Sequence, residues 1–158
     1  MTTMNDIQYI YQMLNKKSAP KIQEEGFALA NTIDDLSLLI MPPAPPSVWE
    51  SCAQILFEKP DEVLEPYLDR LLEWLQDLNW PGAAVILSRL KTVSGGKLKR
   101  LIVDRVTDAN NLKNEEGMMW LDNLSELLDN TELKELLPTA IVETLQKHYK
   151  NTGFWRND

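Results

Sequence analysis

The stretch LEPYLDRLLEWLQDLNWPGAAVILSRL, residues 64–90, carries the strongest structural signal in the chain. Its first half repeats leucine at helical spacing, at positions 68, 71, 72, 75 and 78. The chain then turns between Asp77 and Pro81, and apolar positions resume at 83, 86, 87 and 90. The stretch predicts two amphipathic helices joined by a very short turn, a unit that can stack on copies of itself.

Helical spacing recurs along the rest of the chain, and no segment alternates apolar and polar residues convincingly. The predicted helices sort into four consecutive pairs: IQYIYQML with the helix after Ser18, VWESCAQIL with LEPYLDRLLEWL, AAVILSRL with LKRLIVDRV, and MMWLDNLSELL with LLPTAIVETL. Trp49, Trp80 and Trp120 are 31 and 40 residues apart, within the range of helix-pair repeats. We therefore expect one all-α domain over residues 1–158, a HEAT-like α-solenoid of about four helix pairs. The competing interpretation is an irregular bundle of eight helices.

Prolines and polar residues mark the expected helix boundaries. The segment MPPAPP, residues 41–46, cannot continue a helix because proline lacks an amide hydrogen and crowds the preceding turn. Ser47 and Glu50 have the capping-box spacing, so the third helix is expected to begin there. Pro138 is expected to kink the last helix or to restart it. Phe154 and Trp155 are expected to fold back on that helix, because two exposed rings would form an apolar patch.

The charge balance favours some partners and excludes others. The chain has 16 Lys and Arg against 24 Asp and Glu, a net charge of −8. Such a field repels nucleic acid phosphates and anionic membrane surfaces, so we expect neither partner and favour a protein with a basic surface. The N-terminal residues lack a signal-peptide pattern, and no apolar run approaches the roughly 20 residues of a membrane span, so a cytoplasmic location is expected.

Residues that usually perform catalysis are scarce. The chain has one cysteine, Cys52, expected to be a small buried hydrophobe, and one histidine, His148, near a predicted helix C-terminus where a positive imidazole is favourable. No pair of Cys or His has metal-ligand spacing. SGGK at residues 94–97 lacks the first glycine and the Ser or Thr of a phosphate loop, and is interpreted as an interhelical turn. We therefore expect no catalytic residue, cofactor or metal, and we expect that the protein is not an enzyme.

Paired carboxylates give the strongest indication of a partner. Asp69 and Glu73 are four residues apart on one predicted helix, and Asp104 and Asp108 have the same spacing on the equivalent helix of the next pair. Like charges at this spacing cost a few tenths of a kcal/mol, so two such pairs suggest a negative stripe that binds a basic ligand. Trp74, at one edge of the apolar stripe, is the predicted aromatic anchor.

A second interpretation of this stripe stays open. Arg70, Arg100 and Arg105 can neutralise the neighbouring carboxylates and leave a merely solvated face. The net charge also alternates, negative over residues 61–91, positive over 92–114 and negative over 115–158. This alternation suits a charge-complementary interface with one protein better than indiscriminate binding of polycations.

Two resemblances support the predicted architecture. Residues 64–90 resemble a HEAT-type repeat junction, with Asp77 ending the leucine-rich helix, although Pro81 and Gly82 stand where many such repeats have a Val-Arg pair. The motif EWLQDLNWPGA, with WESCAQIL before it, is similar to the signature of a family of small bacterial domains of unknown function with a HEAT-like helical fold, over residues 22–91. That resemblance implies a fold rather than an activity. Small acidic helical proteins of this sort occur as immunity proteins beside bacterial toxins.

The leading hypothesis from the sequence is a non-enzymatic protein-binding module, in its most concrete form an immunity-type inhibitor that covers a basic toxin site. One alternative is a scaffold or subunit whose apolar edges are covered by copies of itself, and the oligomeric state is left open. A further alternative is a ligand-binding or enzymatic HEAT-like protein with a carboxylate cleft.

Overall fold

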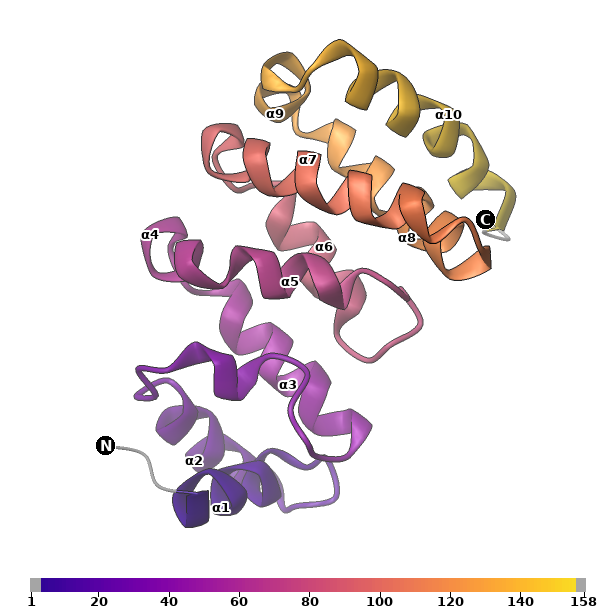
Figure 1. The fold of residues 1–158 in the computed structure, drawn as a ribbon. Helices are drawn as coiled ribbons and strands as arrows, with labels where there is room; N and C mark the ends of the chain where they lie inside the picture. Colours follow the sequence, from indigo (N-terminus) through magenta and orange to yellow (C-terminus); the bar gives the residue numbers. More distant parts are fainter. Residues whose placement is uncertain (1–3, 156–158) are drawn as a thin grey trace.

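The computed structural model describes the backbone of residues 4–155 and the side chains of residues 6–149. Over this range the chain is helical and contains no strand, so the all-α prediction is confirmed (Figure 1). The α-helices are α1 (Met4–Leu14), α2 (Pro20–Ala30), α3 (Pro46–Phe57), α4 (Asp61–Leu64), α5 (Leu68–Trp74), α6 (Ala83–Leu90), α7 (Gly95–Leu112), α8 (Glu115–Ser125), α9 (Thr131–Leu136) and α10 (Thr139–Trp155). Short 3-10 helices are η1 (Leu36–Leu39), η2 (Glu65–Tyr67) and η3 (Glu126–Asp129).

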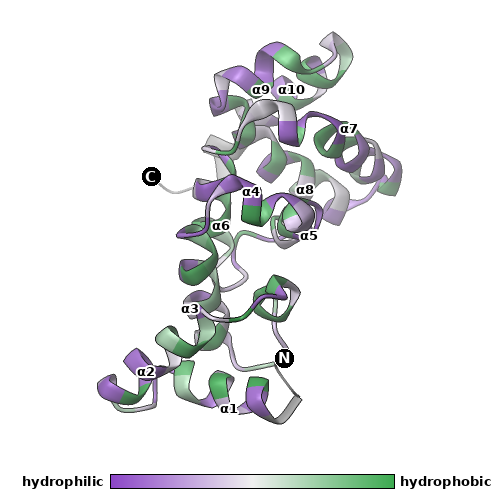
Figure 2. Ribbon diagram, turned by 90° about the vertical axis from the view of Figure 1, so that its left-hand side faces the viewer, coloured by the Kyte–Doolittle hydropathy of each residue, from purple (hydrophilic) through white to green (hydrophobic). Residues whose placement is uncertain are grey.

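The helices follow one another along an elongated molecule. In Figure 1 the chain rises from α1 and α2 at one end to α9 and α10 at the other, and the perpendicular view in Figure 2 shows the same long axis. One continuous cluster of buried apolar side chains reaches from Ile7 in α1 to Leu145 in α10. A single hydrophobic spine therefore connects the two ends.

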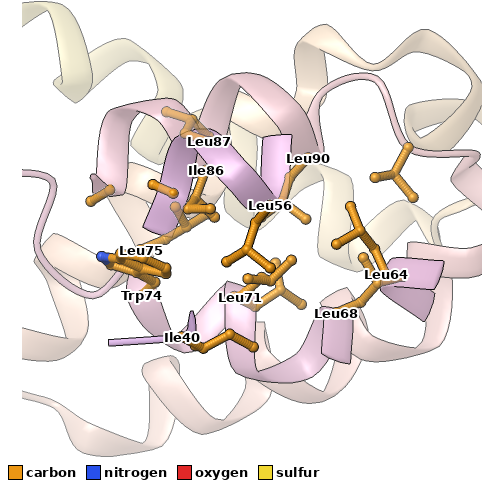
Figure 3. Packing of buried hydrophobic residues seen from close by; sticks show 14 of the residues in the cluster. Ile40, Leu56, Leu64, Leu68, Leu71, Trp74, Leu75, Ile86, Leu87 and Leu90 are labelled. Carbon is orange, nitrogen blue, oxygen red and sulfur yellow. The ribbon is translucent and has the colours of Figure 1, made fainter. Parts of the chain in front are cut away.

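Residues 64–90 form the centre of this spine, as their spacing predicts. Leu68, Leu71, Leu72 and Leu75 are all fully buried, and each such side chain stabilises the fold by about 1.5–3 kcal/mol relative to an exposed one. Figure 3 shows Leu68, Leu71 and Leu75 converging with side chains of α3 and α6 in one interior. The turn is longer than expected, since α5 ends at Trp74 and α6 begins only at Ala83.

The closest helix packing differs from the expected hairpins. The first and last pairs pack as predicted, α1 on α2 and α8 on α10, but α3 packs most closely on α6, and α7 on α8 and α9. The cause lies in the connection before α6. Gly82 has a φ of +80°, and a Cβ on it would lie 2.8 Å from the Cβ of Ala53, so the chain turns tightly against α3 at this point.

Two predicted helix boundaries need correction or refinement. Helix α3 begins at Pro46 without a side-chain cap, so the predicted capping box is wrong. The hydroxyl of Ser47 instead accepts the Lys16 N–H and donates to Asn15 Oδ1, both at 3.3 Å, which ties α3 to the end of α1. Pro138 makes a fresh start, because α9 ends at Leu136 and α10 begins at Thr139.

The last helix, α10, extends to the end of the described backbone. The backbone of α10 continues to Trp155, but the side chains of Phe154 and Trp155, which we expected to fold back, lie outside the described residues. Over the part of the chain that the structure describes, no helix has the length and apolar content needed to cross a membrane.

Side chains of α8 satisfy the open end of α5. The last carbonyl groups of a helix have no partner within it. Trp120 Nε1 donates to the Leu72 carbonyl at 3.1 Å, and Asn123 Nδ2 donates to the Leu75 carbonyl at 2.7 Å. Because the two donors are three residues apart, they lie on one face of α8, and this face fixes α8 against α5.

Candidate partner-binding surface

Arg105 brings the two predicted carboxylate pairs together on one surface. Its Nη1 lies 3.0 Å from Asp69 Oδ1 on α5, and its Nη2 lies 3.0 Å from Asp108 Oδ2 on α7. The Asp69 and Asp108 side chains are still about half exposed, at 45% and 55%. Two of the four carboxylates therefore meet at Arg105, one of the arginines that the alternative interpretation expected to neutralise them.

Glu73 and Asp104 are the other members of the two pairs. Glu73 Oε2 lies 3.5 Å from Arg70 Nε, one turn earlier on the same helix, in a contact that leaves both side chains exposed. Asp104 is exposed and makes no ion pair with the side chains that the structure describes. Exposed ion pairs of this kind contribute about 0.2–1 kcal/mol, so these two charges are available to water or to another protein.

Trp74 is not at the edge of a groove, and its predicted role as an exposed anchor is wrong. The side chain is fully buried. Its Nε1 donates to the Pro81 carbonyl at 3.0 Å, and its ring meets that of Trp49 edge to face at 5.9 Å. The position is three residues after the buried Leu71, so the helical period that places Leu71 in the core also places Trp74 there.

The neighbouring tryptophans close the junction around Trp74. Trp80 packs edge to face on Trp49 at 6.3 Å and is 36% exposed. Trp49 is half-buried, and its Nε1 donates to the Pro42 carbonyl at 2.7 Å. The three rings therefore connect α3, the end of α5 and residues 75–82.

Acidic residues of α4, η2 and α5 pair with basic residues of the next helices. Asp61 Oδ1 lies 2.7 Å from Arg89 Nη2, and Glu65 Oε2 lies 3.0 Å from Lys97 Nζ, which continues the row that Asp69 forms with Arg105. The alternation of charge along the sequence, interpreted above as suited to a partner, is thus used at least in part inside the molecule. The regular spacing of the acidic residues at 61, 65 and 69, opposite the basic residues at 89, 97 and 105, is the signal that sequence reasoning missed.

Asp61 is the most strongly held carboxylate of this row. Its partial burial alone would raise its pKa. The hydrogen bonds from Arg89 and from the Ser94 N–H, with the positive charges of Arg89 and Lys97, outweigh that effect and hold the pKa of Asp61 below its usual range. The folded state therefore favours the ionised form.

The residues that most often perform chemistry have structural contacts here. Cys52 is fully buried, as predicted, and burial raises the pKa of its thiol to about 12. His148 Nδ1 lies 2.7 Å from Asp122 Oδ1, so the imidazole joins α10 to α8 rather than only favouring a helix end. Among the described side chains, no group of His, Cys, Asp and Glu is placed to hold a metal ion.

One surface feature was not found from the sequence. A hollow of about 580 Å³ lies between α1, the end of α2 and η1, with Asp34, Asp35 and Tyr9 among its lining residues. The consecutive aspartates at 34 and 35 were its only visible signal, because the hollow depends on how three separate segments pack.

Comparison with known proteins identifies a family and nothing more specific. No curated protein and no solved structure matches the chain. A family described as "Domain of unknown function (DUF5071)" matches residues 50–149, from the first half of α3 to within α10. The match includes the whole α5–α7 surface and begins after α1, α2 and η1. The chain therefore belongs to the DUF5071 family, a family of unknown function.

Proposed function

We propose that this protein is a HEAT-like helical-repeat module that binds a protein partner through the surface of α5 and α7 that carries the two carboxylate pairs. The observation that carries the proposal is the Arg105 bridge, which holds Asp69 and Asp108 side by side and so places both carboxylate pairs on one surface. Around that bridge, Glu73 and Asp104 supply outward charge. Three of the four carboxylates, those of Asp69, Glu73 and Asp108, contact an arginine, and Asp104 makes no ion pair with the side chains that the structure describes.

The order of helix contacts supports a repeat architecture. In a stack of helix pairs, each pair contacts mainly its neighbours, so equivalent helices of adjacent pairs lie side by side. Here α3 packs on α6 and α5 packs on α7, as first helices on first helices and second helices on second helices. In this arrangement α5 and α7 form neighbouring rows of one face, which is where an extended partner surface would bind.

The paired and the less constrained carboxylates have different roles in the proposal. Arg105 holds Asp69 and Asp108 in place before binding, which lowers the ordering cost of an interface. Glu73, whose contact with Arg70 is exposed, and Asp104 are open to lysine or arginine of the partner. Rim charges of this kind act mainly on the association rate and its salt dependence.

The most concrete version of the proposal is an immunity-type inhibitor that covers a basic site on a toxin. Its support is the net charge of −8 of the chain together with the four carboxylates of the α5–α7 surface. Co-expression with the product of a neighbouring toxin-like reading frame tests it. We expect the wild-type chain to restore growth, and a failure to bind or to protect would contradict the inhibitor version.

The wider proposal is tested by affinity purification from the native cell with two matched double variants. Glu73→Gln with Asp104→Asn removes two charges from the α5–α7 surface, whereas Glu24→Gln with Glu143→Gln removes two exposed charges from α2 and α10. We expect the first variant to recover about tenfold less partner at low salt and the second to match the wild type. Equal recovery by both variants would contradict a role for the α5–α7 surface.

A further inference from the structure

The hollow at the N-terminal end has an apolar interior and an acidic rim. Ile33 is buried beneath it, while Tyr9 and Leu29 line it with 60% and 42% of their side chains exposed. Asp6, Asp34 and Asp35 complete the lining. The apolar atoms of these two side chains are therefore accessible to a ligand on one concave surface.

The hollow is held in shape by contacts of its own lining. The Asp35 carboxylate caps η1, accepting the Ser37 N–H at 3.1 Å and the Ser37 hydroxyl at 2.6 Å. The Tyr11 hydroxyl donates to the Leu38 carbonyl at 2.5 Å and so ties η1 to α1. A concave site that exists before binding costs less to occupy than one that must be formed.

Asp34 and Asp35 are not neutralised by a basic side chain among the residues that the structure describes. No lysine or arginine lines the hollow, and neither Asp34 nor Asp35 makes an ion pair with the side chains that the structure describes. Lys59, at the end of the next helix, donates instead to the carbonyl and side-chain oxygen of Asn31. This differs from the α5–α7 surface, where Arg105 pairs with two carboxylates.

We propose that the hollow binds a short segment of a protein partner in which one arginine or lysine is flanked by bulky apolar residues. The flanking residues fill the space between Tyr9 and Leu29, and the basic group reaches the Asp34 carboxylate. The ring of Tyr9 offers the same cation a favourable face. The site is independent of the α5–α7 surface and lies before the residues that match the family, so it gives this chain a second, separate contact with a partner.

Labelled peptides test the proposal on the full chain. The probe has one arginine between two leucines, and its controls carry citrulline in place of arginine or serines in place of the leucines. Amide chemical shifts are followed by NMR during titration. We expect saturable changes at residues 6–10 and 29–38, with a Kd of about 0.1–1 mM, and binding about tenfold weaker for each control peptide.

Matched variants separate the two components of the site. Asp34→Asn is expected to weaken the arginine peptide about fivefold, and Glu24→Gln, which removes an equal charge from α2, is expected to have no effect. Leu29→Asn is expected to weaken binding, and Ile22→Asn, at a position 40% exposed two turns earlier on α2, is its control. The NMR spectrum of each free variant confirms its fold.

Three results would overturn the proposal. These are the absence of saturable changes in the hollow, equal binding of the arginine and citrulline peptides, and concentration-dependent shifts of the hollow residues in the protein alone. The last result would show that a second copy of the chain occupies the hollow. None of these results depends on Glu73 or Asp104. The binding role of the hollow can therefore be refuted without refuting that of the α5–α7 surface.

Discussion

Alanine at Gly95 and alanine at Gly96 should have opposite effects on stability, although the two residues are adjacent in the first turn of α7. A Cβ on Gly95 would lie 2.5 Å from the backbone nitrogen of Leu133 and 2.8 Å from its Cα, at the start of α9. A Cβ on Gly96 would meet nothing within 4 Å. Because the obstacle at Gly95 is backbone rather than the tip of a side chain, α9 itself must move.

The magnitudes follow from that difference. Replacing glycine by alanine in a helix gains about 0.5 kcal/mol at either position, because the unfolded chain loses freedom. Overpacking at Gly95 costs about 3 kcal/mol against that gain. We expect Gly95→Ala to lower the free energy of unfolding by about 2–3 kcal/mol and Gly96→Ala to raise it by about 0.5 kcal/mol.

Urea denaturation followed by circular dichroism measures both variants under the same conditions. The slope of the transition should stay constant, so that the midpoint alone reports the change. Equal stability of the two variants would show that α9 does not lie against Gly95. That result would contradict the packing of α7 on α9 described above. The same result would reopen an interpretation of residues 94–97 as a ligand-binding loop.

Three further predictions concern the core and its charges. Trp74→Phe should lower the free energy of unfolding by about 2 kcal/mol, because the hydrogen bond to the Pro81 carbonyl is lost and the ring is smaller. In the same urea titration, Trp80→Phe should lower it by less than about 1 kcal/mol. Equal losses would contradict the burial of Trp74. Arg89→Met should destabilise the protein more at pH 7 than at pH 3. The folded pKa of Asp61 lies below its unfolded value, so the contribution of the ionised Asp61 to stability is present above about pH 4 and disappears as the pH falls through the folded pKa. An identical loss of stability at both pH values would refute the pairing of Asp61 with Arg89. Cys52, with its pKa raised to about 12, should react with a thiol reagent at pH 8 only after denaturant is added, and rapid labelling of the native protein would contradict its burial.

Local periodicity predicted the helices and much of the core because both depend on residues close in sequence. The leucines at 68, 71, 72 and 75 follow the helical period and are all fully buried. The same period places Trp74 inside, whereas its aromatic character alone favours an exposed anchor. A residue three positions from a buried leucine is a core residue unless the helix end intervenes.

Contacts between segments that are distant in the chain could not be predicted from the sequence. The four carboxylates were identified from their spacing, but Arg105 selects Asp69, which is 36 residues away, only because α5 and α7 pack together. The closest helix pairs depend on the turn at Gly82, whose positive φ was not visible in the pattern. The N-terminal hollow likewise requires α1, α2 and η1 to be placed relative to one another before its lining residues meet.

The proposed role of the α5–α7 surface is tested most directly by hydrogen exchange in the purified complex with its partner. Backbone amide exchange is compared between the free chain and the bound chain across the whole sequence. The account predicts slower exchange on binding over residues 66–76 and 98–110, where the carboxylate pairs and Arg105 lie. Protection confined to other helices, with these two segments unchanged, would contradict it.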